Sequence, residues 1–305
     1  MGKERQLLMY EEIKNAYGLR PVWDAIGEIY LEFARICNKY RLRHYASGGT
    51  ALGAVRHNGF IPWDDDIDIM LPRTDYEKFL KVARSELPSY LKIVNRHNTP
   101  EFHMLYSKIQ DCRRDKVLEI ERKTGITLSD GLFVDIYPMD GYPQGWKVFS
   151  TKFRLLLLDV LWRYKVMKIK DLSFRGKIAW CIGAGLALLM PKLLSESELM
   201  DAYDGILQEI PYEESEIVSD IGYLRNAFVQ PRIKKSFLGN PTPHIFEDFT
   251  VMLPADIDGY CSNKFGVDYM QLPPEDKRIS THKSPVRCPW WIGPTSDDTA
   301  RKEQL

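Results

Sequence analysis

The segment from Trp63 to Ile69, with the sequence WDDDIDI, constrains the fold more than any other part of the chain. It places four aspartates in five positions between apolar residues, and the apolar run continues to Leu71. On a β-strand, side chains alternate between the two faces, so Asp64, Asp66 and Asp68 would share one face. Like charges this close repel one another, and a divalent cation would offset the repulsion. The segment predicts a metal-binding strand; the alternative is a solvated acidic turn.

The chemistry of these side chains predicts the metal and a further ligand. Oxygen-only ligands favour Mg²⁺ or Mn²⁺, and Mg²⁺ commonly combines one or two carboxylates with substrate phosphates. A two-metal phosphoryl-transfer site needs another carboxylate. Asp135, in the run GLFVDIYP, is the best candidate, because an unpaired charge between apolar neighbours on a buried strand would be costly. Its alternative role is that of a salt-bridged core aspartate.

Charge and cysteine content narrow the class of protein. The 305 residues include 42 Lys or Arg and 42 Asp or Glu, so the formal net charge is zero. A general nucleic-acid binder is usually basic, and we therefore expect no nucleic-acid partner. Five scattered cysteines without a CxxC pair favour reduced thiols in a cytoplasmic protein. The first fifteen residues are charged and lack the apolar core of a secretory signal.

Apolar periodicity predicts alternating helices and strands in the first half of the chain. The expected helices span residues 21–40, 51–57 and 74–84, the last opened by a capping box at Thr74. The expected strands span residues 43–46, 65–71, 91–94, 104–109 and 132–137. This order predicts an α+β fold with a mixed sheet flanked by helices.

The amino-acid composition of the chain changes after residue 145. Residues 178–190 form an apolar run of 13 residues, too short for the roughly 20 residues that cross a bilayer. The run is either a buried helix or an interfacial segment at a membrane surface. We therefore expect a core over 1–145, a helical insertion over 146–204 that contacts a membrane in the second interpretation, and a C-terminal block over 205–305 that completes the site.

A glycine pair upstream of the acidic segment predicts a phosphate-binding turn. It lies between an expected strand and an expected helix. Two glycines let the backbone approach a ligand closely, and the N–H groups at a helix start favour a phosphate. The residues expected to bind substrate here are Ser47, Gly48, Gly49 and Thr50.

The same residues carry a family resemblance. The stretch GTALGAVRHNGFIPWDDDIDI over 49–69 resembles the signature of the LicD family of phosphocholine transferases, which includes the fukutin-type phosphotransferases. Residues 131–141 resemble the next family block, and FED at 246–248, KFGVDYM at 264–270 and LPP at 272–274 resemble its C-terminal block. The resemblance implies a nucleotidyltransferase-like fold. In that fold Asp66 and Asp68 match the paired metal-binding carboxylates, and Asp135 matches the third.

The resemblance also implies a reaction. A phospho-alcohol, phosphocholine first among them, would pass from CDP-choline or another CDP-alcohol to a sugar hydroxyl, with release of CMP. The acceptor would be a lipid-linked or soluble glycan precursor, such as that of lipopolysaccharide or teichoic acid, at the inner face of the membrane. Asp135 would help to deprotonate the acceptor hydroxyl.

Further substrate contacts follow from side-chain chemistry. Arg56 and Lys108 are candidates for the diphosphate oxygens, and an inward Lys108 on a strand would need an anionic partner. A choline head binds aromatic ring faces. Candidates for that contact are Trp63, Tyr137, Trp290 and Trp291.

Three rival functions share parts of this pattern. A nucleotidyltransferase would use the same carboxylates but would release pyrophosphate. A DxD-type glycosyltransferase would also bind a metal through an aspartate motif, although the upstream Gly-Gly-Thr and the isolated Asp135 favour the first scheme. A non-catalytic sugar- or lipid-binding protein would not need a complete set of carboxylates.

Overall fold

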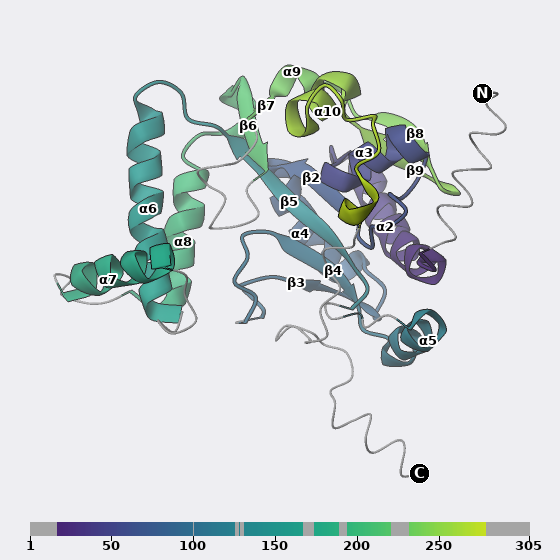
Figure 1. The fold of residues 1–305 in the computed structure, drawn as a ribbon, viewed down its shortest axis with the longest axis horizontal. Helices are drawn as coiled ribbons and strands as arrows, with labels where there is room; N and C mark the ends of the chain where they lie inside the picture. The colour runs from purple at the N-terminus through teal and green to yellow at the C-terminus, as the bar shows by residue number, and fades with distance from the viewer. Residues whose placement is uncertain are drawn as a thin grey trace, which may run out of the picture.

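The computed structural model describes residues 17–99, 101–125, 128, 131–166, 174–188, 194–220 and 232–278. Within these residues, a mixed seven-stranded sheet runs in the order β1-β2-β5-β4-β3, and β6 and β7 extend it from β5 (Figure 1). A separate hairpin pairs β8 with β9. The predicted α+β fold is confirmed.

The strands are β1 (Tyr45–Ala46), β2 (Asp68–Pro72), β3 (Leu91–Val94), β4 (Ser107–Asp111), β5 (Phe133–Gly141), β6 (Ile217–Asp220), β7 (Ile233–Lys234), β8 (Thr242–Phe246) and β9 (Phe249–Leu253). The helices are α2 (Arg20–Tyr40), α3 (Gly48–His57), α4 (Arg73–Glu86), α5 (Arg114–Thr124), α6 (Lys147–Val166), α7 (Phe174–Leu188), α8 (Glu196–Leu207), α9 (Lys235–Leu238) and α10 (Ile257–Phe265).

Strand β5 organises the sheet. It pairs in parallel with β2, antiparallel with β4, and antiparallel with β6 at its C-terminal end. Its apolar residues are buried, as expected for a central strand covered on both faces. Helix α2 contributes buried Val22, Ile26, Ile29 and Phe33 to the main core, and Pro21 occupies its first turn. The predicted helix over 21–40 is confirmed.

Several local predictions are wrong. The strand expected from residue 104 begins at Ser107, and the helix expected from residue 51 begins at Gly48. The acidic strand begins at Asp68 rather than at residue 65, because the ladder partners on β5 begin there, and residues 64–67 are irregular. Helix α4 begins at Arg73, with Pro72 at its N-cap and no side-chain cap hydrogen bond. The capping box expected at Thr74 therefore does not form.

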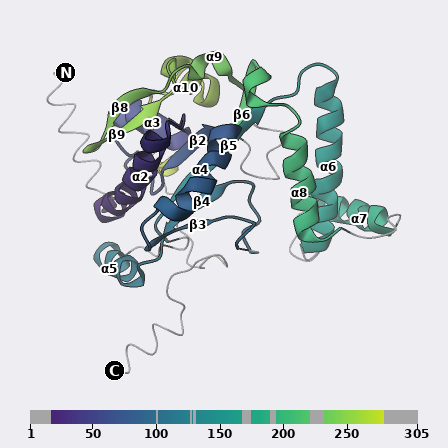
Figure 2. The ribbon, with the colours of Figure 1, turned by 180° about the vertical axis from the view of Figure 1, so that it is seen from behind.

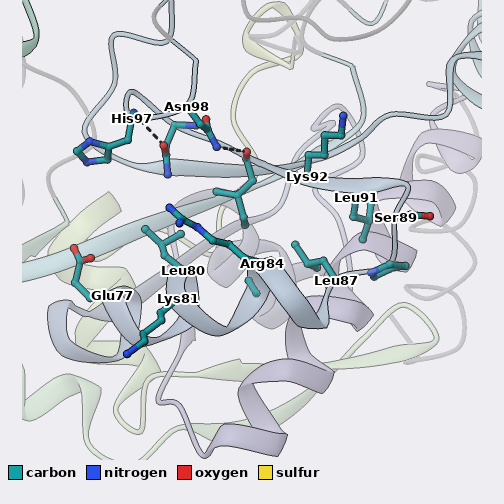
Figure 3. A pocket seen from close by; sticks show the side chains of 14 residues that line it. Glu77, Leu80, Lys81, Arg84, Leu87, Ser89, Leu91, Lys92, His97 and Asn98 are labelled. Atoms are coloured by element: carbon teal, nitrogen blue, oxygen red, sulfur yellow. Dashed lines mark hydrogen bonds between the residues drawn. The ribbon is translucent and has the colours of Figure 1, made fainter.

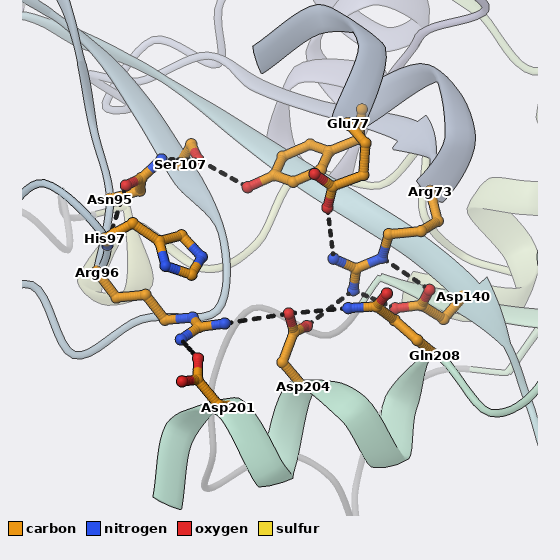
Figure 4. Close-up of polar contacts among 11 residues, drawn as sticks. Arg73, Glu77, Asn95, Arg96, His97, Ser107, Asp140, Asp201, Asp204 and Gln208 are labelled. Atoms are coloured by element: carbon orange, nitrogen blue, oxygen red, sulfur yellow. Dashed lines mark hydrogen bonds and ion pairs between the residues drawn. The ribbon is translucent and has the colours of Figure 1, made fainter. Parts of the chain in front are cut away.

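A buried ionic network joins α8 to the sheet (Figure 4). The Arg73 guanidinium donates to both carboxylate oxygens of Asp140 on β5 and, at 3.1 Å, to Asp204 on α8. Asp204 also accepts from Arg96 at 3.3 Å, and Arg96 pairs with Asp201. The side chains of Arg73 and Asp140 are only 11% and 4% exposed. Removing one partner of such a buried pair costs about 3–5 kcal/mol, so the network fixes α8 against the sheet.

Helices α6, α7 and α8 stand together at one end of the molecule, with α8 between α6 and the sheet (Figures 1 and 2). Leu155 of α6 packs with Met200, Tyr203 and Leu207 of α8 in a separate apolar cluster. Helix α7 is not a buried helix, because Ile178 and Ile182 of its apolar run are 48% and 51% exposed. In the described part of the chain, no helix combines the length and apolar character that crossing a bilayer requires.

Candidate active site

Two of the three predicted metal ligands lie side by side on parallel strands. Asp68 is the first residue of β2 and is the register partner of Asp135 on β5. The Asp135 backbone N–H donates to the Ile67 carbonyl oxygen at 2.9 Å. Directly paired residues point to the same face of a sheet, and neighbouring strands lie about 4.8 Å apart. The sheet therefore brings both carboxylates onto one face.

Lys108 extends this row onto the next strand. It is the register partner of Asp135 on β4, and its Nζ lies 2.8 Å from Asp135 Oδ1 and 3.1 Å from Oδ2. Its ammonium also lies 3.4 Å from the centroid of the Phe133 ring, and the residue is 2% exposed. The Tyr137 hydroxyl donates to Asp135 Oδ2 at 3.3 Å. The anionic partner expected for Lys108 is therefore Asp135, and its contact with a diphosphate stays a prediction.

Backbone contacts fix the position of Asp68. The Ser47 N–H donates to the Asp68 carbonyl oxygen at 2.9 Å, which places Ser47 beside Asp68 at the β1 side of the sheet. The Asp68 N–H donates to Thr50 Oγ1 at 2.8 Å. Two of the four residues predicted to form the phosphate-binding turn thus hold the backbone of Asp68, and its carboxylate does not take part in these bonds.

The glycine pair opens α3 directly against the acidic segment. Gly48 has a φ of +51°, and a β-carbon built there would lie 3.1 Å from Asp68 Oδ2. A β-carbon on Gly49 would lie 2.6 Å from Asp64 Oδ2. A helix N-terminus carries partial positive charge and favours nearby anions. The two glycines therefore let the carboxylates of Asp64 and Asp68 approach the start of α3.

We expect Gly48→Ala to lower both stability and activity. The left-handed φ and the crowding by Asp68 should reduce the free energy of unfolding by roughly 1–3 kcal/mol. Urea unfolding and a transfer assay measure the two effects. The matched control is Gly185→Ala on α7, where a β-carbon meets nothing within 4 Å and alanine should be neutral or stabilising. Equal behaviour of the two variants would contradict a special role for Gly48.

A second polar cluster meets the same turn from the C-terminal half of the chain. Asp220 on β6 accepts from Ser47 Oγ at 3.0 Å and from Lys264 Nζ at 3.0 Å. On α10, the Tyr260 hydroxyl accepts from the Gly48 N–H at 3.1 Å. A β-carbon on Gly48 would lie 3.9 Å from Lys264 Nζ. The turn is thus enclosed by residues far apart in the sequence.

The surroundings of Lys264 keep its side chain charged. Burial acts to lower the pKa of the ammonium, but Asp220 outweighs it, Asp68 adds to the effect, and the pKa lies above its ordinary value. Lys264 belongs to a motif of the resembled family but was not predicted to act in the site, and Asp220 was not predicted at all. The spacing of four between Tyr260 and Lys264 places both on one helix face and could have suggested the pair. No comparable signal marks Asp220.

Arg56 lies away from the aspartate pair. It is eight residues after Gly48 on α3, which corresponds to about 12 Å along the helix. Its Nη1 donates to the carbonyl oxygens of Tyr269 at 3.1 Å and Gln271 at 3.2 Å, and its Nε donates to His57. The structure therefore places Arg56 where it anchors the C-terminal loop. Its predicted contact with a diphosphate has no support from these contacts.

The two described aromatic candidates for a choline contact, Trp63 and Tyr137, belong to different apolar clusters. Trp63 is 8% exposed and packs with Leu52 and Ile61, and the Arg278 guanidinium lies 5.8 Å from its ring centroid. Tyr137 lies instead beside Asp135, to which its hydroxyl donates a hydrogen bond. Trp290 and Trp291 fall outside the described residues. A cation of the chain already faces Trp63, and the Tyr137 ring lies against the Tyr106 ring with the centroids 4.5 Å apart, so the contact with choline stays a prediction for both.

The donor set fits a magnesium ion that arrives with a phosphate. Within the described ranges, no three or more His, Cys, Asp or Glu side chains are arranged to hold a metal ion. Asp66 is buried in the irregular segment before β2, and Asp68 and Asp135 form a pair. Mg²⁺ commonly takes one or two protein carboxylates and completes its coordination with water and substrate oxygens. A centre built by all three aspartates stays a prediction.

A groove of about 650 Å³ lies elsewhere, between α4 and the edge strand β3 (Figure 3). Its cationic side chains are Lys81, Arg84 and Lys92, and Leu80 and Leu87 line its floor. None of the residues predicted to act in catalysis or substrate binding lines this groove. The groove therefore does not locate the site, whereas strand register does.

Known proteins resemble this chain over the segments that build the site. Residues 41–151 match the family described as LicD/FKTN/FKRP, nucleotidyltransferase domain. The lipopolysaccharide cholinephosphotransferase LicD of Haemophilus influenzae is 26% identical over 266 residues, which are 82% of this chain and 90% of that protein. An uncharacterized protein of Rickettsia typhi is 37% identical over 65 residues, 21% of this chain and 20% of its own.

The similarity to the H. influenzae phosphotransferase over most of the chain supports an enzyme of the phosphotransferase class. Its substrates are a separate question, since the relative's name describes only that relative. Residues 41–151 are similar to the LicD/FKTN/FKRP family model, and the resemblance seen in the sequence motifs is confirmed.

Proposed function

We propose that the protein transfers a phospho-alcohol, with phosphocholine the preferred group, from a CDP-activated donor to a sugar hydroxyl of a cell-surface glycan precursor, and releases CMP. One observation carries the proposal: Asp68 and Asp135 are register partners, and the carboxylate of Asp68 approaches the N-terminus of α3. The relative from H. influenzae, named a lipopolysaccharide cholinephosphotransferase, supports the choice of transferred group and of a glycan acceptor.

The start of α3 is the proposed cradle for the donor diphosphate. The N–H groups after Gly48 and Gly49 point out of the helix end, where phosphates bind well. Lys264 adds a full positive charge beside this turn. Mg²⁺, or Mn²⁺ in its place, held by Asp68 with Asp66 and Asp135, would neutralise the diphosphate and the departing CMP.

Asp135 is the proposed acceptor of the proton from the sugar hydroxyl. It lies on the same face as Asp68, and Lys108 and Tyr137 orient its carboxylate. A positioned carboxylate can accept a proton during attack on phosphorus. The attacking oxygen then forms a bond to the phosphorus of the phospho-alcohol, and the bond to the CMP oxygen breaks.

Product analysis separates this reaction from its rivals. Incubation with CDP-choline, Mg²⁺ and a glycan acceptor should yield CMP and a phosphocholine-bearing product, and chelation of the metal with EDTA should stop the reaction. Chromatography of the nucleotides gives the readout, and added Mg²⁺ should restore turnover. Release of pyrophosphate from CTP would favour a nucleotidyltransferase. Turnover of a nucleotide-sugar instead would favour a glycosyltransferase.

We place the reaction at the cytosolic face of the membrane. The scattered cysteines suit a reducing compartment, and a glycan precursor on a lipid carrier would be presented there. The donor head group is tested by a panel of CDP-alcohols that includes choline, ribitol and glycerol. A preference for a polyol over choline would change the transferred group and leave the reaction type intact.

A further inference from the structure

The exposed apolar side chains concentrate on two helices that the proposed chemistry does not use. Of the twelve exposed large hydrophobic residues in the described part of the chain, seven lie on or directly before α6 and α7. Four of them are Trp146, Phe149, Phe153 and Leu156, with exposed fractions of 80%, 67%, 62% and 44%. Their spacing of three, four and three places them on one face of α6. We name these four residues the α6 stripe.

Helix α7 carries a similar set. Phe174, Ile178 and Ile182 are 79%, 48% and 51% exposed, and their spacing of four places them on one face. We name them the α7 stripe. The opposite side of α7 packs on α6, where a β-carbon on Gly183 would lie 2.2 Å from the Val160 carbonyl oxygen. Val160 follows Leu156 by four residues, so α7 covers the C-terminal continuation of the face that carries the α6 stripe, and the stripe is the part of that face that stays exposed.

The positive charge around the two stripes favours an anionic partner. The described residues 146–166 and 174–188 contain seven Lys or Arg and one Asp, a net charge of +6 in a chain whose total is zero. Lys152 flanks the α6 stripe, and Arg175 and Lys177 flank the α7 stripe. Apolar and aromatic residues flanked by basic ones are typical of helices that lie in the surface of an anionic membrane. A second copy would bring two surfaces of like charge together.

We propose that the α6 and α7 stripes dock the protein on the surface of an anionic lipid bilayer. The aromatic and aliphatic side chains would enter the headgroup region, and the flanking ammonium and guanidinium groups would meet lipid phosphates. The acceptor consequence, that the enzyme works on a lipid-linked glycan precursor, rests on the proposed function. The docking itself does not depend on that function.

Vesicle flotation of the full-length protein tests the docking. Binding is expected to vesicles rich in phosphatidylglycerol and to weaken as salt is raised, and little binding is expected to phosphatidylcholine alone. The paired variants are Phe149→Ser with Phe153→Ser on α6, and Ile178→Ser with Ile182→Ser on α7. Each pair should lower the partition coefficient at least about tenfold. The control is Ile245→Ser on β8, an exposed hydrophobic position outside the helices.

Several results would overturn the docking proposal. They are absence of binding to anionic vesicles, unchanged binding in both paired variants, or loss confined to one helix. A dimer in light scattering that dissociates in the stripe variants, without vesicle binding, would assign the surface to a second copy. Circular dichroism and thermal unfolding confirm that each variant is folded. Because CMP release is assayed separately with a soluble acceptor, failure of docking and failure of the proposed function are distinguishable.

Discussion

Asp68→Ala is expected to reduce phosphotransfer by at least about 10³-fold without unfolding the protein, the scale on which charge stabilisation contributes in phosphoryl transfer. The side chain faces the start of α3, whereas the bonds that hold residue 68 in the sheet use its backbone N–H and carbonyl. Loss of the carboxylate also relieves repulsion with Asp135. CMP release measures the activity, and urea unfolding measures stability.

Two comparisons make this result specific. Asp66→Ala should be equally inactive if the third predicted ligand takes part, and Asp24→Ala on α2, at an exposed position, should behave as the wild type. Turnover of Asp68→Ala with a CDP-alcohol and Mg²⁺ near the wild-type rate would refute the assignment of the site. Loss of stability by several kcal/mol would leave the fold, and not the chemistry, as the reason for lost activity.

Asp135→Asn is expected to slow transfer at least about 10²-fold, the scale of a lost general base. This substitution has a second effect, because it leaves the buried ammonium of Lys108 without its carboxylate. Breaking a buried pair in this way costs about 3–5 kcal/mol. The double variant Asp135→Asn with Lys108→Met removes both charges and should recover most of the lost stability. It should remain as inactive as Asp135→Asn.

The double-mutant cycle therefore separates two roles of one carboxylate. Lys108→Met alone should be destabilised by a similar amount, since it leaves Asp135 buried beside apolar neighbours. Activity measured at a temperature where every variant is folded gives the comparison. If the double variant regains both stability and turnover, Asp135 serves only as the partner of Lys108, and the proposed proton acceptor lies elsewhere.

Local chemistry made some elements predictable and left others hidden. The predicted bounds of helix α2 differ from the observed ones by one residue, because its apolar spacing and Pro21 are properties of adjacent residues. The start of β2 was three residues off, because a strand begins where its neighbours offer hydrogen bonds. Those neighbours, Ser47 and Asp135, come from distant parts of the chain. A run of aspartates cannot show where such partners begin.

In the candidate site, too, features set by local sequence could be predicted and contacts between distant residues could not. The pairing of Asp68 with Asp135 was expected from the motifs and is seen in the register of β2 and β5. The contacts of Asp220 with Ser47 and Lys264 were not, because the residues are far apart in sequence and meet only through tertiary packing. Arg56 shows the converse: a cation near a motif can serve the packing of a loop.

The guanidinium of Arg73 donates to Asp140 on β5 and to Asp204 on α8, and so holds α8 against β5. Strand β5 also carries Asp135, and α8 packs against α6. A protein seated on lipid through α6 and α7 would therefore hold its catalytic strand at a constant height above the headgroups. Only acceptors whose tether matches that height could reach the carboxylates. The Arg73 contacts would then fix the distance between the lipid surface and the catalytic strand. This distance would select glycans by the length of their carrier linkage.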